Sequence, residues 1–251
     1  KTMAVRMRGS SMEVQGFRRE AADFRRLGAT VRLMPTKLVF TPPAIPAGQS
    51  LPDLLTQVRA CQICAAHLPL PPRPVLQAAA SARILIASQA PGIKVHESGR
   101  PFTDASGERL REWLGMDEAT FYDAAQVAII PMGFCYPGRG RGGDLPPRPE
   151  CAPAWRAPLL ERLPQLQLIL AIGQYAMAYH LPADGGTEVG KGRGTLTEKV
   201  RGGLVLGADG LPVLPLPHPS PRNNIWLARN PWFEAQVLPL LRQRVALALA
   251  A

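Results

Sequence analysis

Short apolar runs alternate with helix-like stretches from about residue 81 onward. Four of these runs have the length and apolar character of buried strands, and they cover residues 83–88, 126–131, 166–172 and 211–216. Between the first two, residues 105–115 place Leu110, Trp113 and Leu114 on one helical face and stop at Gly115. The alternation predicts a single α/β domain with a four-stranded, mainly parallel sheet and helices on both faces. Two prolines in the fourth run predict an edge position for that strand.

The first 48 residues are predicted to stand outside this domain, as a basic, disordered leader or linker, which leaves residues 49–251 for the fold. Residues 1–37 hold nine Lys or Arg against three Asp or Glu, and residues 41–52 are rich in proline. An arginine-rich leader is typical of organelle transit peptides, although the acidic residues dilute that pattern and a misplaced reading frame explains it equally well. The expected location is the cytoplasm of a prokaryote, or the nucleus or an organelle if the leader is a transit peptide.

The formal charge of +10 is compatible with a nucleic-acid partner. Residues 38–251 nevertheless hold twenty Lys or Arg against sixteen Asp or Glu, so the predicted domain is only mildly basic. Charge alone therefore does not identify a DNA-binding protein. No apolar run approaches the ~20 residues of a membrane-spanning helix, and the chain is expected to be soluble, without a membrane partner.

All four cysteines fall into two pairs, Cys61 with Cys64 and Cys135 with Cys151. A Cys-x2-Cys pair and a second pair can together hold one soft metal centre, either an iron–sulfur cluster or a tetrahedral zinc. Disulfides are disfavoured because no secretory signal precedes the cysteines and the first pair is closely spaced. Inert or redox-active thiols are the alternatives to a metal site.

The polar and glycine-rich loops follow the predicted strands. In a parallel sheet, ligands bind beyond the carboxyl ends of the strands. The loops concerned are residues 89–103, 132–150 and 218–224, and they hold most of the unusual residues of the chain. This coincidence predicts one site built from all three loops.

The first of these loops contains glycines, a histidine–glutamate pair and a large aromatic residue. Gly92 permits close approach of the backbone to a ligand, and Phe102 either packs in the core or stacks on a ligand. His96 and Glu97 could act as an acid–base pair, but adjacent charged residues on a loop are more often solvated. No G-x-G-x-x-G follows the strand, which disfavours a dinucleotide site.

The loop at 218–224 holds His218 between two prolines, which restrict the backbone on both sides of it. A rigid imidazole is suited to stabilising negative charge that develops on a substrate. Ser220, Arg222 and Asn223 can bind phosphate. Asn223 or Asn224 is also expected to cap the helix that follows.

Three motifs together resemble those of the uracil-DNA glycosylase superfamily. They are Gln89-Ala90-Pro91-Gly92, Gly99-Arg100-Pro101-Phe102 and His218-Pro219-Ser220-Pro221-Arg222. The cysteine layout is similar to that of the iron–sulfur branch, called family 4, and the stretch from His218 to Asn223 is similar to the single-strand-selective branch. The resemblance covers about residues 54–245 and implies the three-layer α/β sandwich of that superfamily.

The resemblance implies a DNA-repair enzyme that flips uracil or another deaminated base out of DNA and hydrolyses its N-glycosidic bond. Phe102 would stack on the base, His218 would stabilise charge on uracil O2, and Gln89 would orient the attacking water. The remaining substrate-binding residues would be Ala90, Pro91, Gly92, Ser220, Arg222 and Asn223. The ligands of a [4Fe–4S] cluster, or of zinc as the alternative, would be Cys61, Cys64, Cys135 and Cys151. The implied partner is single- or double-stranded DNA, bound by a monomer.

Two positions depart from the family pattern. Family 4 members have glutamate where this chain has Gln89, and an amide cannot stabilise a cationic sugar as a carboxylate does. The asparagine that reads the uracil edge is replaced by Pro131. These departures leave two alternatives open: a non-catalytic or altered-specificity relative that binds DNA, and a metal-containing enzyme that acts on nucleotides or another small metabolite.

Overall fold

The computed structural model describes residues 40–182, 194–207 and 210–251. The chain divides into two units, residues 1–39 and 40–251, and the second contains all the described elements. Most of the leader predicted for residues 1–48 lies outside the described residues. In the described part of it, Phe40 and Ile45 pack against the hydrophobic core.

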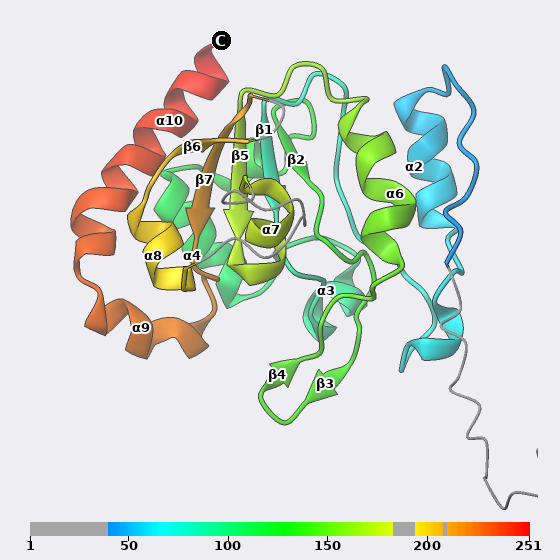
Figure 1. The fold of residues 1–251 in the computed structure, drawn as a ribbon, viewed down its shortest axis with the longest axis horizontal. Helices are drawn as coiled ribbons and strands as arrows, with labels where there is room; N and C mark the ends of the chain where they lie inside the picture. The colour runs from blue at the N-terminus through cyan, green and yellow to red at the C-terminus, as the bar shows by residue number, and fades with distance from the viewer. Residues whose placement is uncertain (1–39, 183–193, 208–209) are drawn as a thin grey trace, which may run out of the picture. The chain divides into compact units, whose positions relative to one another are not determined.

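Five strands form the central sheet, in the order β2-β1-β5-β7-β6 (Figure 1). They are β1 (Ile84–Ala87), β2 (Val127–Ile129), β5 (Leu168–Ile172), β6 (Val205–Leu206) and β7 (Pro212–Leu216). The β1 strand pairs in parallel with β2 and β5, β5 pairs in parallel with β7, and β6 pairs antiparallel with β7. The expected α/β fold and mainly parallel sheet are confirmed, but the expected number of four strands is wrong because β6 adds a fifth.

The β7 strand is not the edge strand that its prolines predicted. Its outer side is covered by β6, which pairs only with Pro212 and Val213. Pro215 pairs with Ala171 of β5 and lies beyond the two residues that β6 covers. A strand of two residues is too short to produce a sequence pattern, and yet it occupies the edge.

Helices cover both faces of the sheet, with α7 (Gly173–His180) on the near side of β5 and α4 (Ala105–Leu114) on its far side in Figure 1. The α4 helix is the one predicted at 105–115. At its start the Asp104 side chain accepts from the N–H of Gly107, and Gly115 ends it in a left-handed conformation. The other helices are α2 (Leu51–Arg59), α3 (Ile93–Ser98), α5 (Glu118–Phe121), α6 (Cys151–Leu160), α8 (Leu196–Arg201), α9 (Asn224–Arg229) and α10 (Leu238–Ala250). Shorter or irregular helical turns are η2 (Ala65–His67), η3 (Pro221–Asn223) and η4 (Phe233–Val237).

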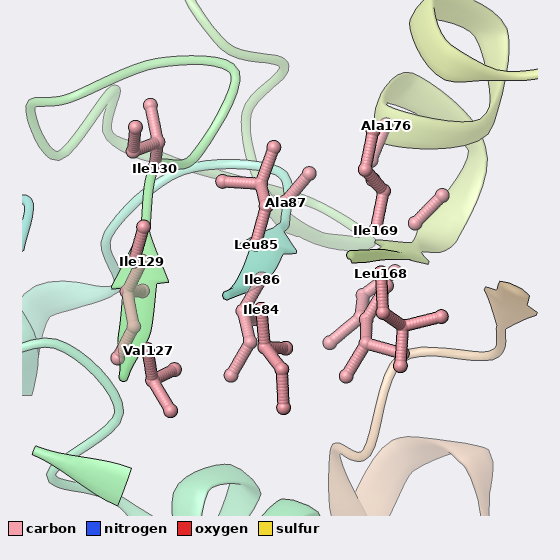
Figure 2. Packing of buried hydrophobic residues seen from close by; sticks show 14 of the residues in the cluster. Ile84, Leu85, Ile86, Ala87, Val127, Ile129, Ile130, Leu168, Ile169 and Ala176 are labelled. Atoms are coloured by element: carbon pink, nitrogen blue, oxygen red, sulfur yellow. The ribbon is translucent and has the colours of Figure 1, made fainter. Parts of the chain in front are cut away.

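The core lies between these layers. Every residue of β1, β2 and β5 is buried. Figure 2 shows side chains of these three strands extending from both sides of the sheet, as expected for a sheet covered on both faces. In the described part of the chain, no helix is long and apolar enough to cross a membrane.

A two-stranded hairpin projects from the domain near α3 (Figure 1). Its strands, β3 (Arg139–Gly140) and β4 (Gly143–Asp144), pair antiparallel. The sequence pattern predicted only a long loop here, because two-residue strands show no alternation. The hairpin belongs to the loop that runs between Cys135 and Cys151.

One charged residue among the described ones is fully buried, Arg156. It lies in α6, and its guanidinium donates to the carbonyls of Ile130 at 3.0 Å and Pro131 at 3.2 Å. Another of its nitrogens contacts Nε2 of His180, and the Tyr179 ring centroid lies 5.0 Å from the guanidinium carbon. Arg156 thereby satisfies carbonyl groups just beyond the end of β2 and fixes the start of the 132–150 loop.

Acid is expected to destabilise the fold through His180. Burial, and then the adjacent Arg156 charge, lowers the pKa of His180 from 6.5 to about 2. The imidazole is therefore neutral in the fold but takes up a proton in the unfolded chain below about pH 6.5. Its contribution to stability is fully present above that pH and is lost by about 1.4 kcal/mol per unit below it. Urea unfolding at pH 7 and pH 5 should show this loss in the wild type and a smaller one in His180→Gln, which keeps an acceptor for Arg156. Equal losses in both proteins would contradict the assignment.

Candidate functional site

A cavity of about 510 Å³ opens at the carboxyl ends of the parallel strands, within the ~300–1,000 Å³ typical of small-molecule sites. The structure places all nine predicted catalytic and substrate-binding residues around it, and they are Gln89, Ala90, Pro91, Gly92, Phe102, His218, Ser220, Arg222 and Asn223. The β5 strand lies between β1 and β7, so the first and last loops follow strands that are not neighbours. They still meet because parallel strands end at the same edge of the sheet.

His218 is held in a defined tautomer. Its Nδ1 accepts a hydrogen bond from the backbone N–H of Ser220 at 3.2 Å, so the neutral ring carries its proton on Nε2. Burial is the main cause that lowers the pKa of His218; Arg222 lowers it further, while Asp104 and Asp144 raise it. The arrangement therefore presents a neutral imidazole with an N–H donor, which can stabilise an oxyanion.

The loop that carries His218 is fixed from three directions. The Asn223 side-chain amide donates to the carbonyl of His218 at 2.7 Å, and Arg109 of α4 donates to the carbonyl of Ser220 at 3.2 Å. The Ser220 hydroxyl accepts from the N–H of Arg222 at 3.2 Å. Asn223 is the N-cap residue of α9, as predicted, but its side chain makes no capping hydrogen bond there. The amide of Asn223 braces the histidine instead.

Phe102 both packs in the core and lines the cavity. Its side chain is buried and lies edge-on to Phe121, with ring centroids 6.1 Å apart. Its φ of 54° is the only positive value of a non-glycine residue in the described part of the chain. The Tyr122 hydroxyl donates to the carbonyl of Phe102 at 3.0 Å, and Gly107 leaves room for that carbonyl. The unusual backbone sets the ring at the cavity wall, and such strain is often found at binding sites.

Gln89 and Pro131 line the same cavity. The Gln89 side-chain amide donates to the carbonyl of Leu145 at 3.0 Å, next to the hairpin, and its backbone carbonyl accepts from Gly133 at 2.9 Å. Pro131 offers an apolar ring where an amide could read a base edge. The first loop is therefore tied to the hairpin by Gln89.

His96 and Glu97 do not contribute to the cavity wall. Both belong to α3, and Arg73 donates to the two backbone carbonyls at 2.7 Å each. The His96 ring is tilted against that of Tyr136, with ring centroids 6.3 Å apart, and Glu97 is exposed, so the two side chains do not form an acid–base pair of this cavity.

The sequence pattern missed three charged residues that line the cavity, Lys94, Asp104 and Asp144. Asp104 could have been found, because it directly precedes the predicted helix at 105–115 as a helix cap. Asp144 could not, because its place depends on the fold of the β3–β4 hairpin.

Residues 76–242 match the family model described as the Uracil DNA glycosylase superfamily. The chain belongs to this superfamily. The matched region contains all three motifs, all nine predicted cavity residues, and Cys135 and Cys151. Cys61 and Cys64 precede it.

In this uracil DNA glycosylase superfamily member, all four cysteines line a second, smaller hollow, together with Pro74, Gly133, Phe134 and Arg148. None of the four forms a disulfide. Burial is the main cause that raises the pKa of Cys135 to about 11 and of Cys151 to about 12, and the neighbouring thiols raise both further. Burial and Cys61 also raise the pKa of Cys64.

The thiols share this hollow without the geometry of a single-ion site. Within the described ranges, no group of three or more His, Cys, Asp or Glu side chains is arranged to hold one metal ion. The donor set still fits a soft metal centre, because four unpaired sulfurs from distant parts of the chain face one space. Their raised pKa values mean that a bound cation would have to stabilise the thiolates.

Proposed function

We propose that this protein is a DNA glycosylase that hydrolyses the N-glycosidic bond of uracil or another deaminated base after flipping it out of DNA. The observation that carries the proposal is the neutral His218 with its Nε2 proton, held in the same cavity as Phe102. Superfamily membership supports the general class of reaction.

In such a reaction, Phe102 and His218 would have separate roles. The flipped base would stack on Phe102, which typically contributes ~1–3 kcal/mol per base. As the bond between the sugar C1′ and the base nitrogen breaks, its electron pair passes into the base, and the Nε2 proton of His218 would stabilise the resulting oxyanion. Because this charge exists only late in the reaction, His218 acts on the transition state more than on binding.

The DNA backbone would be held by the loop that follows His218. Ser220, Arg222 and Asn223 line the rim beside it, and Lys94 adds a positive charge from α3. Positive side chains around the opening supply the phosphate contacts on which binding depends. This arrangement suits a nucleotide that remains part of a DNA strand.

The test is release of the base from oligonucleotides that carry uracil, hypoxanthine or xanthine, as single strands and as duplexes. Alkali then cleaves the strand at each abasic product. Strand breaks confined to the modified position would support the proposal. Intact strands with all three bases in both forms would overturn it.

A second candidate is a relative that binds DNA through the same cavity without excising a base. Its specific support is the engagement of Gln89 by the hairpin and the apolar Pro131 in place of a base-reading amide. Such a protein would bind the oligonucleotides, with affinity that falls steeply as salt rises, and leave them uncut. Weak salt dependence and binding of free nucleotides would instead favour an enzyme of small metabolites.

We also propose that Cys61, Cys64, Cys135 and Cys151 hold a [4Fe–4S] cluster. Four unpaired thiols around one hollow support a metal centre, and the choice of a cluster over zinc rests on the resemblance to the iron–sulfur branch. When bound, the group would join Cys135 to Cys151 and so tie both ends of the loop that carries the hairpin.

Protein purified without oxygen is expected to be brown and to contain iron and acid-labile sulfide. Replacing Cys135 or Cys151 with alanine should remove the colour and lower the melting temperature, because the hairpin loop loses its tie. Absorption spectra and metal analysis check both results. Colourless wild-type protein with stoichiometric zinc would contradict the cluster.

A further inference from the structure

The cavity lacks a carboxylate at position 89 but has two others on its wall. They are Asp104, at the start of α4, and Asp144, in the second strand of the hairpin. Both are close enough to His218 to raise its pKa, against the larger effect of burial, which lowers it. Each is therefore near the place where a substrate would meet the imidazole.

The Asp104 carboxylate is already engaged. One of its oxygens accepts from the N–H of Gly107 at 3.3 Å, and the other accepts from the Ser106 hydroxyl at 3.3 Å. These bonds cap α4. Asp104 is thus committed to the helix.

The Asp144 carboxylate is free by comparison. Among the described residues it has no hydrogen-bond or ion-pair partner, although the hairpin holds its backbone opposite Arg139. Its Oδ2 lies only 3.4 Å from where a Cβ on Gly92 would stand. The hairpin therefore brings an unpaired carboxylate against the first loop of the cavity.

Gln89 is matched to this arrangement. Its amide N–H group donates to the carbonyl of Leu145, the residue that follows Asp144. A glutamate in the same rotamer would set a carboxylate oxygen against that carbonyl oxygen, and would add a second negative charge beside Asp144. An amide at position 89 and a carboxylate on the hairpin are therefore complementary.

We infer that Asp144 is a catalytic carboxylate of the reaction proposed above, supplied by the hairpin in place of the one absent at Gln89. It accepts a proton from the water that attacks the sugar C1′, while the bond from C1′ to the base nitrogen breaks and its electrons leave with the base. Its negative charge also stabilises the cationic sugar as that bond lengthens. This role rests on the proposed glycosylase function.

The test compares Asp144→Asn with Glu112→Gln, an equal change of charge on an exposed residue of α4 that does not line the cavity. Single-turnover base release is measured on whichever deaminated oligonucleotide the wild type cleaves. Affinity is measured on the same strand with a 2′-fluorinated deoxynucleotide, which resists hydrolysis. Asp144→Asn should slow release by about 100-fold or more and keep its affinity, whereas Glu112→Gln should change neither by more than about threefold.

A second experiment moves the carboxylate from position 144 in the hairpin to position 89 in the first loop. In the Asp144→Asn background, Gln89→Glu should recover at least about tenfold in rate, because the new carboxylate lines the same cavity and no longer has the negative charge of Asp144 beside it. In the wild-type background the same change should bring no gain. If Gln89→Glu restores no rate in the Asp144→Asn background, the inference that Asp144 replaces a carboxylate at position 89 is overturned.

The outcomes separate this inference from the function on which it rests. A wild-type protein inactive on every deaminated base overturns the glycosylase itself. An active wild type with Asp144→Asn within about threefold of it overturns only the role of Asp144. A variant that loses rate and affinity by the same factor also overturns it, because Asp144 would then serve only to hold the hairpin.

Discussion

His218→Ala is expected to slow base release by about 100- to 1,000-fold, the usual cost of removing one donor from an oxyanion site. The reason is the hydrogen bond from the Ser220 N–H to Nδ1, which leaves the Nε2 proton free for the departing base. Affinity for the uncleavable oligonucleotide should change little, because the charge that His218 stabilises does not exist in the bound substrate. Single-turnover rates and fluorescence anisotropy measure the two quantities separately.

The matched control is His96→Ala, which removes an imidazole from α3 near the cavity but not from its wall. It should retain the wild-type rate. A His218→Ala protein that keeps its full rate would show that this imidazole is not the oxyanion donor.

The pH dependence should also follow from His218. Burial lowers its pKa, so the neutral form persists below the ordinary range of histidine. The contribution of His218 to the rate should therefore be complete at neutral pH and decline only when the pH falls through that lowered pKa.

The strands could be predicted from the sequence where each one corresponds to a single continuous apolar run. The segments at 83–88, 126–131, 166–172 and 211–216 each contain a strand, because a strand buried on both faces needs apolar residues throughout. The β6 strand and the hairpin were missed for the opposite reason. Strands of two residues are defined by the partner they pair with, and no local pattern records that partner.

For the candidate site, too, local sequence patterns predicted some features, and features that depend on distant residues were missed. The three loops that follow the strands could be placed together, because parallel strands end at a common edge. The state of each side chain could not be predicted, since it depends on distant partners: Ser220 sets the tautomer of His218, and Leu145 holds the amide of Gln89. Arg156 was not singled out either, because a lone arginine in an apolar helix has no sequence signal for the carbonyls it satisfies.

Gly107→Ala is expected to destabilise the protein by about 3 kcal/mol, at the upper end of the effects of overpacking. A Cβ at Gly107 would overlap the carbonyl oxygen of Phe102 and lie 2.6 Å from its carbonyl carbon and 2.8 Å from its Cβ. Those atoms cannot easily retreat. Phe102 already has a φ of 54°, and its carbonyl accepts a hydrogen bond from the Tyr122 hydroxyl.

The same clash should reach the cavity, because the carbonyl that it displaces belongs to the residue whose ring would stack on the base. Gly107→Ala is therefore expected to weaken binding of the uncleavable oligonucleotide as well as lower the melting temperature. Gly142→Ala is the control: it also lines the cavity, but a Cβ there would meet nothing within 4 Å. Urea unfolding and anisotropy on the two variants give the comparison. If Gly107→Ala unfolds at the urea concentration of the wild type, the backbone of Phe102 is not held by this contact, and the ring is placed by its packing against Phe121 alone.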